Sequence, residues 1–418
     1  MLAHRIPYPP STGDKVRAYH VLRHLARRHA VTLACLGDER DPVPASALRE
    51  VVADLLVENP PRAERLARSL WTLALGGSAT VGYFHSPALH ARLAGQAARA
   101  PFDVVYVSSS SMTPYARHGG GAPVVADFVD VDSDKWRQYA SLLPAHRGWL
   151  YRLEAARLGR EEARAARLAA RCLVTTRVEA QLLTALAPGS AVAVVPNGVD
   201  LEYFRPADRN GPPPPVMIFT GAMDYLPNAD AAVYFAERIF PRVREAVPAA
   251  RFLVVGKNPA RAVRRLAGRP GITVTGSVPD VRPFLHEAAV AVAPLRIARG
   301  VQNKVLEAMA AGLPVVTTSV AHRGLDAIPG RHLLVEDDPT RFAETVIRLL
   351  ATPALRAALG EAARRFVERH HSWTATATAV EGIVEAAAGR AAAPAVCAPG
   401  VGADALAQEP DPERGVRA

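Results

Sequence analysis

The chain has 418 residues, of which 49% are hydrophobic and 22% charged, a composition typical of globular proteins with enough apolar residues for sizeable cores. Its length predicts two domains with additional segments. No apolar run reaches the length of a membrane span, and the first residues lack the apolar region of a signal peptide. The cysteines Cys35, Cys172 and Cys397 have no metal-ligand spacing, so we expect a reducing cytoplasm.

The formal net charge is +10, and most basic residues are arginines. A positive balance of this size suits nucleic acid, an anionic membrane surface or phosphorylated substrates as partners. It equally suits a genome that favours Ala, Arg and Pro. The sequence contains no recognised nucleic-acid-binding motif, so we expect no nucleic-acid partner.

The N-terminal half predicts alternating strands and helices. A short apolar strand (residues 2–6) precedes a loop with Gly13, and an amphipathic helix follows with Asp14 as its N-cap. A first strand this short is unusual for an α/β domain, so we expect the natural start to lie upstream. Later strands are expected at residues 30–36, 102–107, 123–128, 172–176 and 191–195.

Two of these strands end in polar clusters, which begin at Ser108 and Asp130. Ligands of parallel sheets lie outside the carboxyl ends of the strands. The clusters are therefore candidate walls of a ligand site. Each aspartate could instead cap a helix or a turn.

A long helix is expected over residues 148–170, and its arginines fall on one side. They lie within roughly 140° of one another at 100° per residue. Glu154, Glu161 and Glu162 are interspersed among them. A solvated helix face and a binding surface are both compatible with this stripe, which comprises Arg152, Arg157, Arg160, Arg164, Arg167 and Arg171.

A Pro/Gly run at residues 211–215 predicts an extended linker, and a second strand–helix series follows it. Its strands are expected at residues 216–220, 251–255, 272–275, 289–294 and 314–318, with a short one at 333–335. Helices are expected after Pro227 and at residues 340–350 and 354–368, and a last amphipathic helix after Trp373. The tail beyond it has little apolar area to bury, so we expect disorder there.

The stretch from Pro294 to Ser319 predicts a strand end, a glycine loop, a helix and a strand. Gly300 supplies the flexible loop, the helix is expected to start at Gln302 or Asn303, and Gly312 ends it. Such a unit directs unpaired N–H groups and the positive helix end at one point, where a phosphate or diphosphate can be held.

Lys304 and Glu307 lie three residues apart on one face of this helix. The lysine could add a charge-assisted contact to a phosphate, and the carboxylate could accept hydrogen bonds from the two vicinal hydroxyls of a ribose. The alternative is a surface Lys–Glu pair on an ordinary strand–helix unit.

Several motifs resemble the two-domain (GT-B) glycosyltransferases of family 4. The interdomain match is VPNGVDLEYFRP, and the matches in the second half are FTGAMDYLPNADAAVYF, FPRVREAVPAARFLVVG, VTGSVPDVRPFL and GVQNKVLEAMAAGLPVV. Three more resemble a narrower branch, the sugar transferases found with exosortase (PEP-CTERM) and exopolysaccharide loci: RIPYPPSTGDKVRAYHVLRHLA, DFVDVDSDKWRQYA and HSW. The resemblance covers about residues 5–388.

The resemblance implies two doubly wound Rossmann-like α/β domains that face a cleft, with a C-terminal helix returning toward the N-terminal domain. The implied parts are an acceptor-binding domain (1–195), a linker (196–215), a nucleotide-sugar-binding domain (216–370), the crossing helix (371–388) and a disordered tail (389–418).

It also implies the roles of individual residues. Glu307 would hold the donor ribose, backbone N–H groups around Val305 and Leu306 the diphosphate, and the Val278 segment the base. The other residues assigned to the donor are Gly221, Arg299, Gly300, Asn303 and Lys304. The loop that closes over the phosphate would contain Gly13, Asp14, Lys15 and Arg17. The acceptor side would contain Ser108, Asp127, Asp130 and Asp132, with Asp130 preferred for positioning the acceptor.

Two positions depart from the family pattern. Family 4 usually has a second glutamate eight positions before Glu307, where this chain has Arg299. The usual lysine in the loop after Gly221 is absent, and Arg299 and Lys304 could supply the missing charge. These departures concern the sugar and the leaving group and leave the fold unaffected.

The expected activity is transfer of a sugar from a nucleoside-diphosphate-sugar, without metal or cofactor and with retention of anomeric configuration. The expected acceptor is lipid-linked or a growing exopolysaccharide, and the expected location is the cytoplasm or the inner face of its membrane. The alternatives are a nucleotide-sugar 2-epimerase of the same fold and a non-catalytic nucleotide-sugar-binding protein.

Overall fold

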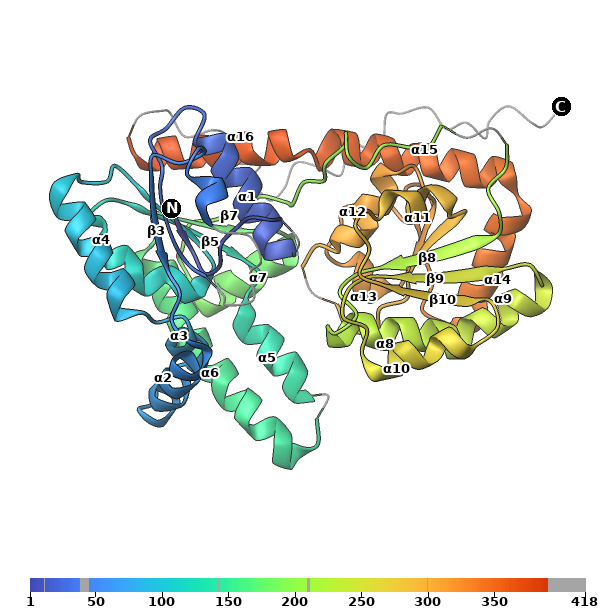
Figure 1. The fold of residues 1–418 in the computed structure, drawn as a ribbon, viewed down its shortest axis with the longest axis horizontal. Coiled ribbons are helices and arrows are strands. Elements are labelled where there is room, and N and C mark those ends of the chain that lie inside the picture. The colour runs from blue at the N-terminus through green and yellow to red at the C-terminus, as the bar shows by residue number, and fades with distance from the viewer. Residues whose placement is uncertain (11, 38–44, 142, 209–210, 299, 390–418) are drawn as a thin grey trace.

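The computed structural model describes residues 1–418 except 11, 38–44, 142, 209–210, 299 and 390–418. Two α/β domains lie side by side, and the last long helices run along the same side of both (Figure 1). Both sheets contain parallel strands throughout, and such strands require crossover helices that cover the faces of the sheet. The predicted fold class is confirmed.

The N-terminal sheet has seven strands in the order β3-β2-β1-β4-β5-β6-β7. β1 consists of only two residues, yet it pairs with β2 and β4 in the middle of the sheet. The strand bounds are β1 Leu2–Ala3, β2 Thr32–Leu36, β3 Asp54–Glu58, β4 Val105–Ser108, β5 Val124–Val129, β6 Arg171–Val174 and β7 Val192–Val194.

The helices of this domain include three that the sequence did not predict, α2, α3 and α4, which follow the unpredicted strand β3. α1 begins at Gly13 with Thr12 at the N-cap position, so the expectation that Asp14 caps it was wrong. The bounds are α1 Gly13–Leu25, α2 Arg62–Ala74, α3 Ala79–Tyr83, α4 Pro87–Arg99, α5 Asp132–Ser141, α6 Ala145–Leu168 and α7 Arg177–Leu186, with 3-10 helices η1 Ala45–Leu48 and η2 Ser110–Gly119.

The C-terminal sheet has six strands in the order β10-β9-β8-β11-β12-β13. Its five longer strands lie where the sequence predicts them, because strands buried in a parallel sheet are largely apolar runs, and the edge strand β10 is only partly buried. The bounds are β8 Val216–Thr220, β9 Arg251–Val255, β10 Ile272–Gly276, β11 Val290–Ala293, β12 Val315–Thr317 and β13 Leu334–Val335.

Helices cover both faces of this sheet, and the apolar residues on the two sides form two core clusters. A π-helical turn, η3 (Phe235–Ile239), joins α8 to α9. The helix bounds are α8 Leu226–Tyr234, α9 Phe240–Ala246, α10 Arg261–Arg264, α11 Arg282–Glu287, α12 Asn303–Ala310, α13 Ser319–His322, α14 Pro339–Ala351, α15 Pro353–His370 and α16 Trp373–Ala387, with the 3-10 helix η4 Arg265–Gly268.

α15 belongs to the C-terminal domain, and α16 crosses to the N-terminal one. Val380, Ile383 and Val384 of α16 are buried in the same cluster as Val21 and Leu22 of α1. The expected return of the last helix is therefore observed. The tail expected to be disordered lies outside the described residues.

The segment between the domains packs against the turn that joins α15 to α16. The Val199 N–H donates to the His371 carbonyl (2.7 Å), and the His371 ring contacts the Asn197 carbonyl through Nδ1 (2.9 Å). A Cβ on Gly198 would lie 2.5 Å from the backbone nitrogen of Trp373, so only glycine fits there. The chain crosses between the domains twice, at the interdomain segment and at the turn from α15 to α16, and these contacts hold the two crossings together. Among the described residues, no helix is both long and apolar enough to cross a bilayer.

Candidate functional site

Two glycine loops lie next to each other at the carboxyl edge of the C-terminal sheet. Gly221 follows β8 with φ of +153°, and a Cβ there would lie 2.7 Å from the Asn228 Nδ2 and 3.4 Å from the Lys304 Cε. Gly256, after β9, approaches the Gly221 carbonyl so closely that a Cβ would overlap it. The absence of side chains therefore lets the loop close down on Lys304 and Asn228.

Lys304 lies in the first turn of α12 and is held by its neighbours. Its Nζ donates to the Asn228 Oδ1 (2.8 Å) and the Gln302 Oε1 (3.4 Å), and it lies over the Phe219 ring. Burial lowers the pKa of Lys304 to about 8, and the charge of Glu307 opposes that shift. Sequence reasoning missed Asn228 as the residue that orients this ammonium group, because no local pattern links positions 76 residues apart.

Glu307 lies one turn further along α12 and is partly buried. Burial raises its pKa to about 7, against the opposing charge of Lys304. Within the described residues its carboxylate has no hydrogen-bond donor. A carboxylate of this kind can accept hydrogen bonds from hydroxyl groups of a ligand.

The start of α12 is open at its backbone. The N–H groups of Val305 (2.8 Å) and Leu306 (3.4 Å) point back to the Gln302 carbonyl. In any helix, the N–H groups that lack an intrahelical acceptor are those at its start, and in α12 these include the N–H groups of Asn303 and Lys304. The expectation that Val305 and Leu306 present their N–H groups thus shifts by two residues toward the helix start, while their side chains are buried.

Residues of the N-terminal domain meet this region at two points. A Cβ on Gly13 would lie 3.3 Å from the Asn303 Nδ2, and a Cβ on Gly300 would collide with the Asp130 carboxylate. Gly300 has φ of +54°, a left-handed conformation that suits glycine. Gly13, Asp130, Gly300 and Asn303, predicted from separate motifs, therefore lie together at the domain interface.

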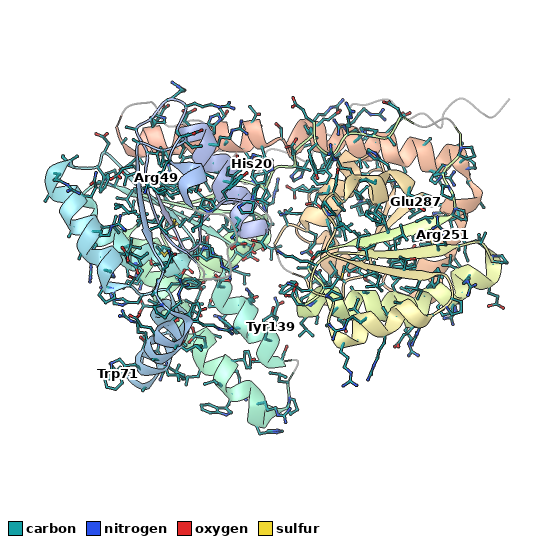
Figure 2. The ribbon with its side chains drawn as sticks, viewed as in Figure 1. His20, Arg49, Trp71, Tyr139, Arg251 and Glu287 are labelled. Atoms are coloured by element: carbon teal, nitrogen blue, oxygen red, sulfur yellow. The ribbon has the colours of Figure 1, made fainter. Side chains whose placement is uncertain are left out.

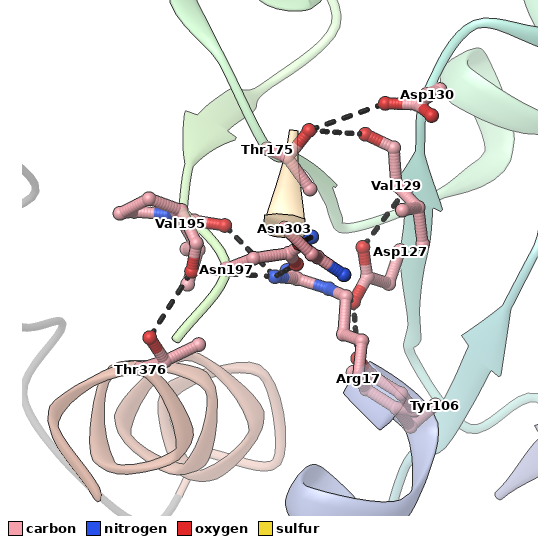
Figure 3. A network of polar contacts seen from close by, with 11 residues as sticks. Arg17, Tyr106, Asp127, Val129, Asp130, Thr175, Val195, Asn197, Asn303 and Thr376 are labelled. Carbon is pink, nitrogen blue, oxygen red and sulfur yellow. Dashed lines mark hydrogen bonds and ion pairs between the residues drawn. The ribbon is translucent and has the colours of Figure 1, made fainter. Parts of the chain in front are cut away.

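Asp130 directly follows β5. The Thr175 hydroxyl donates to the Asp130 Oδ1 (3.3 Å) and to the Val129 carbonyl (3.0 Å), as Figure 3 shows. Val129 has φ of +63°, which is uncommon for a β-branched residue. The Val131 N–H donates to the buried carboxylate of Glu179 (2.6 Å). This loop is therefore held in a fixed shape that directs Asp130 to the Gly300 loop.

Arg17 and Asp127 were both predicted to face ligands, and the structure instead pairs them with each other. Arg17 is fully buried, and its Nε donates to the Asp127 Oδ2 (2.7 Å). Its Nη1 donates to the Val195 carbonyl and the Asn197 Oδ1 (both 3.0 Å), and the Tyr106 hydroxyl also donates to Asp127. Arg17 was predicted for the loop over the phosphate and Asp127 for the acceptor side, and the two instead form one buried ion pair (Figure 3).

Asn197 lies at the centre of the same network and was not predicted. It accepts from Arg17, and its Nδ2 donates to the Asn303 Oδ1 (3.3 Å). It therefore connects α1, the interdomain segment and the start of α12. The sequence signal at this position was the interdomain motif VPNGVDLEYFRP, which contains Asn197 and Gly198.

The remaining predicted residues lie in several environments. Asp14 is bound by His4 (3.1 Å) and Arg5 (3.8 Å); burial raises the pKa of Asp14, but these partners hold it well below its usual range. Lys15 is buried in the first turn of α1, and Ser108 is the buried last residue of β4.

Three further predictions concern more distant positions. Asp132 begins α5 and pairs with Lys135 (3.7 Å). Val278 follows β10 and packs on a core cluster. Arg299 lies outside the described residues.

Comparison with known proteins gives one family match for each domain. The model described as Glycosyltransferase Family 4 matches residues 12–203, and the model described as Glycosyl transferases group 1 matches residues 214–352. A curated relative, the D-inositol 3-phosphate glycosyltransferase of Segniliparus rotundus, is 30% identical over half of each chain. The phosphatidyl-myo-inositol mannosyltransferase of Mycobacterium tuberculosis is 30% identical over 49% of this chain and 56% of its own.

The curated relatives are thus matched over about half of their length. Solved structures align over both domains: sucrose-phosphate synthase from Thermosynechococcus elongatus has a TM-score of 0.66 at 17% identity, covering 91% of this chain and 97% of its own. HepE of Anabaena, solved with UDP-glucose, has a TM-score of 0.64 at 12% identity, covering 92% and 99%. Each domain thus matches a glycosyltransferase family model over its own residues, and the solved structures share the two-domain GT-B fold.

Proposed function

We propose that the chain transfers a sugar from a nucleoside-diphosphate-sugar to a lipid-linked or growing exopolysaccharide acceptor. The observation that supports this most directly is the meeting of the two domains at α12. The open helix start, Lys304 and Glu307 come from one domain, and Gly13 and Asp130 come from the other.

The donor would bind on the C-terminal side. The N–H groups at the start of α12 and the Lys304 ammonium group favour a diphosphate, since both present positive charge to one point. The Glu307 carboxylate would accept hydrogen bonds from the two ribose hydroxyls. HepE, a structural neighbour, is solved with UDP-glucose, which supports a nucleotide-sugar as the class of donor.

The chemistry would depend on charge that develops on the leaving diphosphate. Preorganised N–H dipoles and a fixed cation stabilise that charge in the transition state. Asp130 would orient the acceptor hydroxyl, which supplies the benefit of proximity. We propose a front-face transfer with retention, in which a donor phosphate oxygen takes the acceptor proton and no metal takes part.

Arg299 would add to the positive charge at the diphosphate. Arg299→Glu restores the residue that family 4 usually has there, and we expect it to lower turnover because a carboxylate close to a diphosphate is repelled. Retained or improved turnover would refute this role.

We also propose that the acceptor lies at an anionic membrane surface, as we expect for the sugar transferases of exosortase-associated loci that the sequence resembles. α2 supports this, because its apolar side faces solvent: Leu70, Trp71 and Leu75 are 67%, 68% and 70% exposed. Trp71 points away from the body of the domain in Figure 2. Its inward side is polar, since Arg65 is buried and Ser69 donates to the Ala79 carbonyl (2.8 Å).

The arginine stripe on α6 adds charge to this side of the domain, with one correction. Arg152, Arg160, Arg164 and Arg167 are exposed, but Arg157 donates to the Leu73 and Gly77 carbonyls and thereby fastens the end of α2 to α6. Tryptophan and leucine flanked by arginine are typical of helices that lie in a bilayer interface.

Donor binding tests the proposed site directly. Calorimetric titration with UDP- and GDP-sugars should find a donor, and Glu307→Ala should weaken it by about 1.5–3 kcal/mol, the range for hydrogen bonds to a charged group. Glu344→Ala on the exposed side of α14 is the matched control and should bind as wild type. Unchanged affinity in Glu307→Ala would remove the ribose role.

Turnover separates a transferase from a non-catalytic binding protein. A radiolabelled donor incubated with membrane lipid extract should give labelled lipid or saccharide, whereas binding without product would favour the non-catalytic alternative. The matched families and relatives do not favour the 2-epimerase alternative.

Membrane association has its own test. The protein should pellet with anionic liposomes at low salt, and the pair Leu70→Ser and Trp71→Ser should abolish pelleting while donor binding is kept. Leu168→Ser, a change at an equally exposed leucine at the end of α6, is the control. If the wild-type protein ignores anionic liposomes, the acceptor is reached in another way.

A further inference from the structure

Histidines and carboxylates gather where the end of α1 faces the crossing helix α16. Glu381 and Glu385 lie one turn apart on α16, and His24 and His29 lie at and just after the end of α1. The His29 Nε2 is 3.1 Å from the Glu381 Oε1 and 3.6 Å from the Glu385 Oε1, and the His24 Nε2 is 3.1 Å from the Glu381 Oε2. Among the described residues, His29, Glu381 and Glu385 form the one group whose ligand atoms lie close enough to share a cation.

These spacings match the edges of a zinc coordination tetrahedron. With Zn–N and Zn–O bonds of about 2.0–2.2 Å, two ligand atoms of a tetrahedral site are about 3.3–3.6 Å apart. Both contacts of the His29 Nε2 lie close to that range. Imidazole nitrogen with carboxylate oxygen is also a donor set that zinc accepts. A cation could therefore enter without movement of the backbone.

Arg28 at present neutralises part of the negative charge. Its guanidinium lies 3.3 Å from the Glu381 Oε2 and 3.8 Å from the Glu385 Oε1. The Arg28 side chain is 66% exposed, whereas Glu381 is 6% exposed. An exposed arginine side chain can rotate away into solvent at small cost in free energy. A buried carboxylate, in contrast, still requires a positively charged partner.

We propose that His29, Glu381 and Glu385 bind a zinc-class divalent cation, with His24 or water as the fourth ligand. Binding releases any proton on the His29 Nε2, because the metal takes that lone pair. This cation has no part in the proposed sugar transfer. His24 lies about 17 Å along α1 from Gly13, at a rise of 1.5 Å per residue.

The position of the cluster gives the cation a structural role. The apolar side of α16 is already buried against α1, through Val384 and its neighbours. A cation would fasten the polar edge of the same contact and hold the crossing helix, which leads from the C-terminal domain, on the N-terminal domain. Local opening of α16 should then become rarer, since a ligand that binds only the closed form stabilises it.

A second histidine cluster in the same domain provides a matched control. The His90 Nδ1 and the His118 Nε2 are 2.8 Å apart, and the guanidinium of Arg117 lies 3.4 Å from the His90 Nδ1. The positive charge of Arg117 beside these two histidines would repel a metal cation. His118→Gln should therefore leave zinc binding unchanged.

The test is calorimetric titration of the full chain with zinc chloride. We expect one site, and we expect His29→Gln and Glu385→Gln each to weaken it on the order of a hundredfold, as loss of one zinc ligand does. Arg28→Gln should tighten zinc binding about threefold, because it removes a competing ion pair of surface strength. Zinc should also slow hydrogen exchange in α16 of the wild-type protein and leave the Glu385→Gln variant unchanged.

Several results would overturn the proposal. These are the absence of zinc binding, a site that survives His29→Gln and Glu385→Gln, and a site lost in His118→Gln. In each case the cluster would be an ion-pair network only. Glu385 is partly exposed, so its variant should fold even if the His29 variant does not.

Discussion

The two domains hold the loops at their sheet edges in different ways. The N-terminal domain uses buried charged side chains that reach across the chain, namely Lys15, Arg17, Arg65, Asp127, Glu154, Glu162 and Glu179. Among the described residues of 216–370, Arg356 of α15 is the one buried charged side chain. There, glycines at Gly221, Gly256, Gly300 and Gly324 allow backbone segments to touch.

Two glutamates of α6 show how the charged side chains work. Glu154 accepts from the Ser78 hydroxyl (2.6 Å) and from the backbone at the start of α3, at Ala79 (2.7 Å) and Thr80 (2.9 Å). Glu162 accepts from the Ser133 N–H (3.2 Å) at the start of α5. These glutamates belong to the supposed basic stripe, yet they serve as acceptors for helix N-termini.

The difference teaches where each domain is sensitive to change. In the N-terminal domain, removal of one charge leaves its partner buried and uncompensated. In the C-terminal domain, addition of one methyl group separates two loops. The following variants test this contrast, from the largest expected effect to the smallest.

Arg17→Met should be the most destabilising change. It leaves the Asp127 carboxylate buried without its cation, and breaking a buried pair in this way costs about 3–5 kcal/mol. Urea unfolding measures the loss. Arg17→Met combined with Asp127→Asn should recover part of it, and a loss below about 1 kcal/mol in the single variant would show that the pair contributes little.

Gly256→Ala should destabilise the C-terminal domain by about 3 kcal/mol, because the new Cβ overlaps the Gly221 carbonyl and backbone cannot yield cheaply. Donor affinity should fall as well. Gly95→Ala is the control: this glycine lies exposed in α4 with nothing within 4 Å, so alanine should be neutral or stabilising there. Equal stability of the two variants would contradict the role of close approach.

Glu162→Gln should change how stability depends on pH. Burial raises the pKa of Glu162 to about 8. As pH rises from about 4.5 to 8, the unfolded chain therefore ionises this group before the folded one, and the free energy of unfolding falls. Glutamine keeps the acceptor oxygen and removes the titration.

The Glu162→Gln variant should gain roughly 3–4 kcal/mol over wild type at pH 8 relative to pH 5, measured by urea unfolding at both values. A gain of the same size at pH 5 would instead point to a change in packing.

Affinity for the proposed nucleoside-diphosphate-sugar donor should be greatest between about pH 7 and 8. Glu307, whose pKa is raised to about 7, accepts both ribose hydroxyls only when ionised, and Lys304, whose pKa is lowered to about 8, attracts the diphosphate only when protonated. Each limb should fall toward tenfold per pH unit, about 1.4 kcal/mol. Glu307→Gln should flatten the acidic limb and Lys304→Met the alkaline one, and a profile unchanged in both variants would rule out this assignment.

Parts of the site could be predicted because their signals are local. Gly300, Asn303, Lys304 and Glu307 lie within one strand–loop–helix unit, whose helix starts where the sequence predicts. Asp130 was found because polar residues after a parallel strand face the ligand edge. Asn228 and Asn197 were missed because each acts on a residue more than 70 positions away.

α2 shows a different limit of sequence reasoning. The sequence did not predict this helix, and its apolar residues recur with a helical spacing that normally marks a side facing the core. In the structure the polar side is inward, because Arg65 finds carbonyl acceptors at Pro60 and Gly37. Periodicity identifies the two sides of a helix, but only its neighbours decide which one is buried.

The sequence by itself determined the alternation of strands and helices, the two α/β domains and the course of α12, because apolar runs, glycines and prolines act on their own few residues. The tertiary structure decided which charges are buried together. Arg17 and Asp127 stand 110 positions apart and gain their partner only when α1 packs on the sheet. Burial makes that pairing obligatory, because a charge removed from water requires a counter-charge, and no local pattern reveals which residues will be buried together.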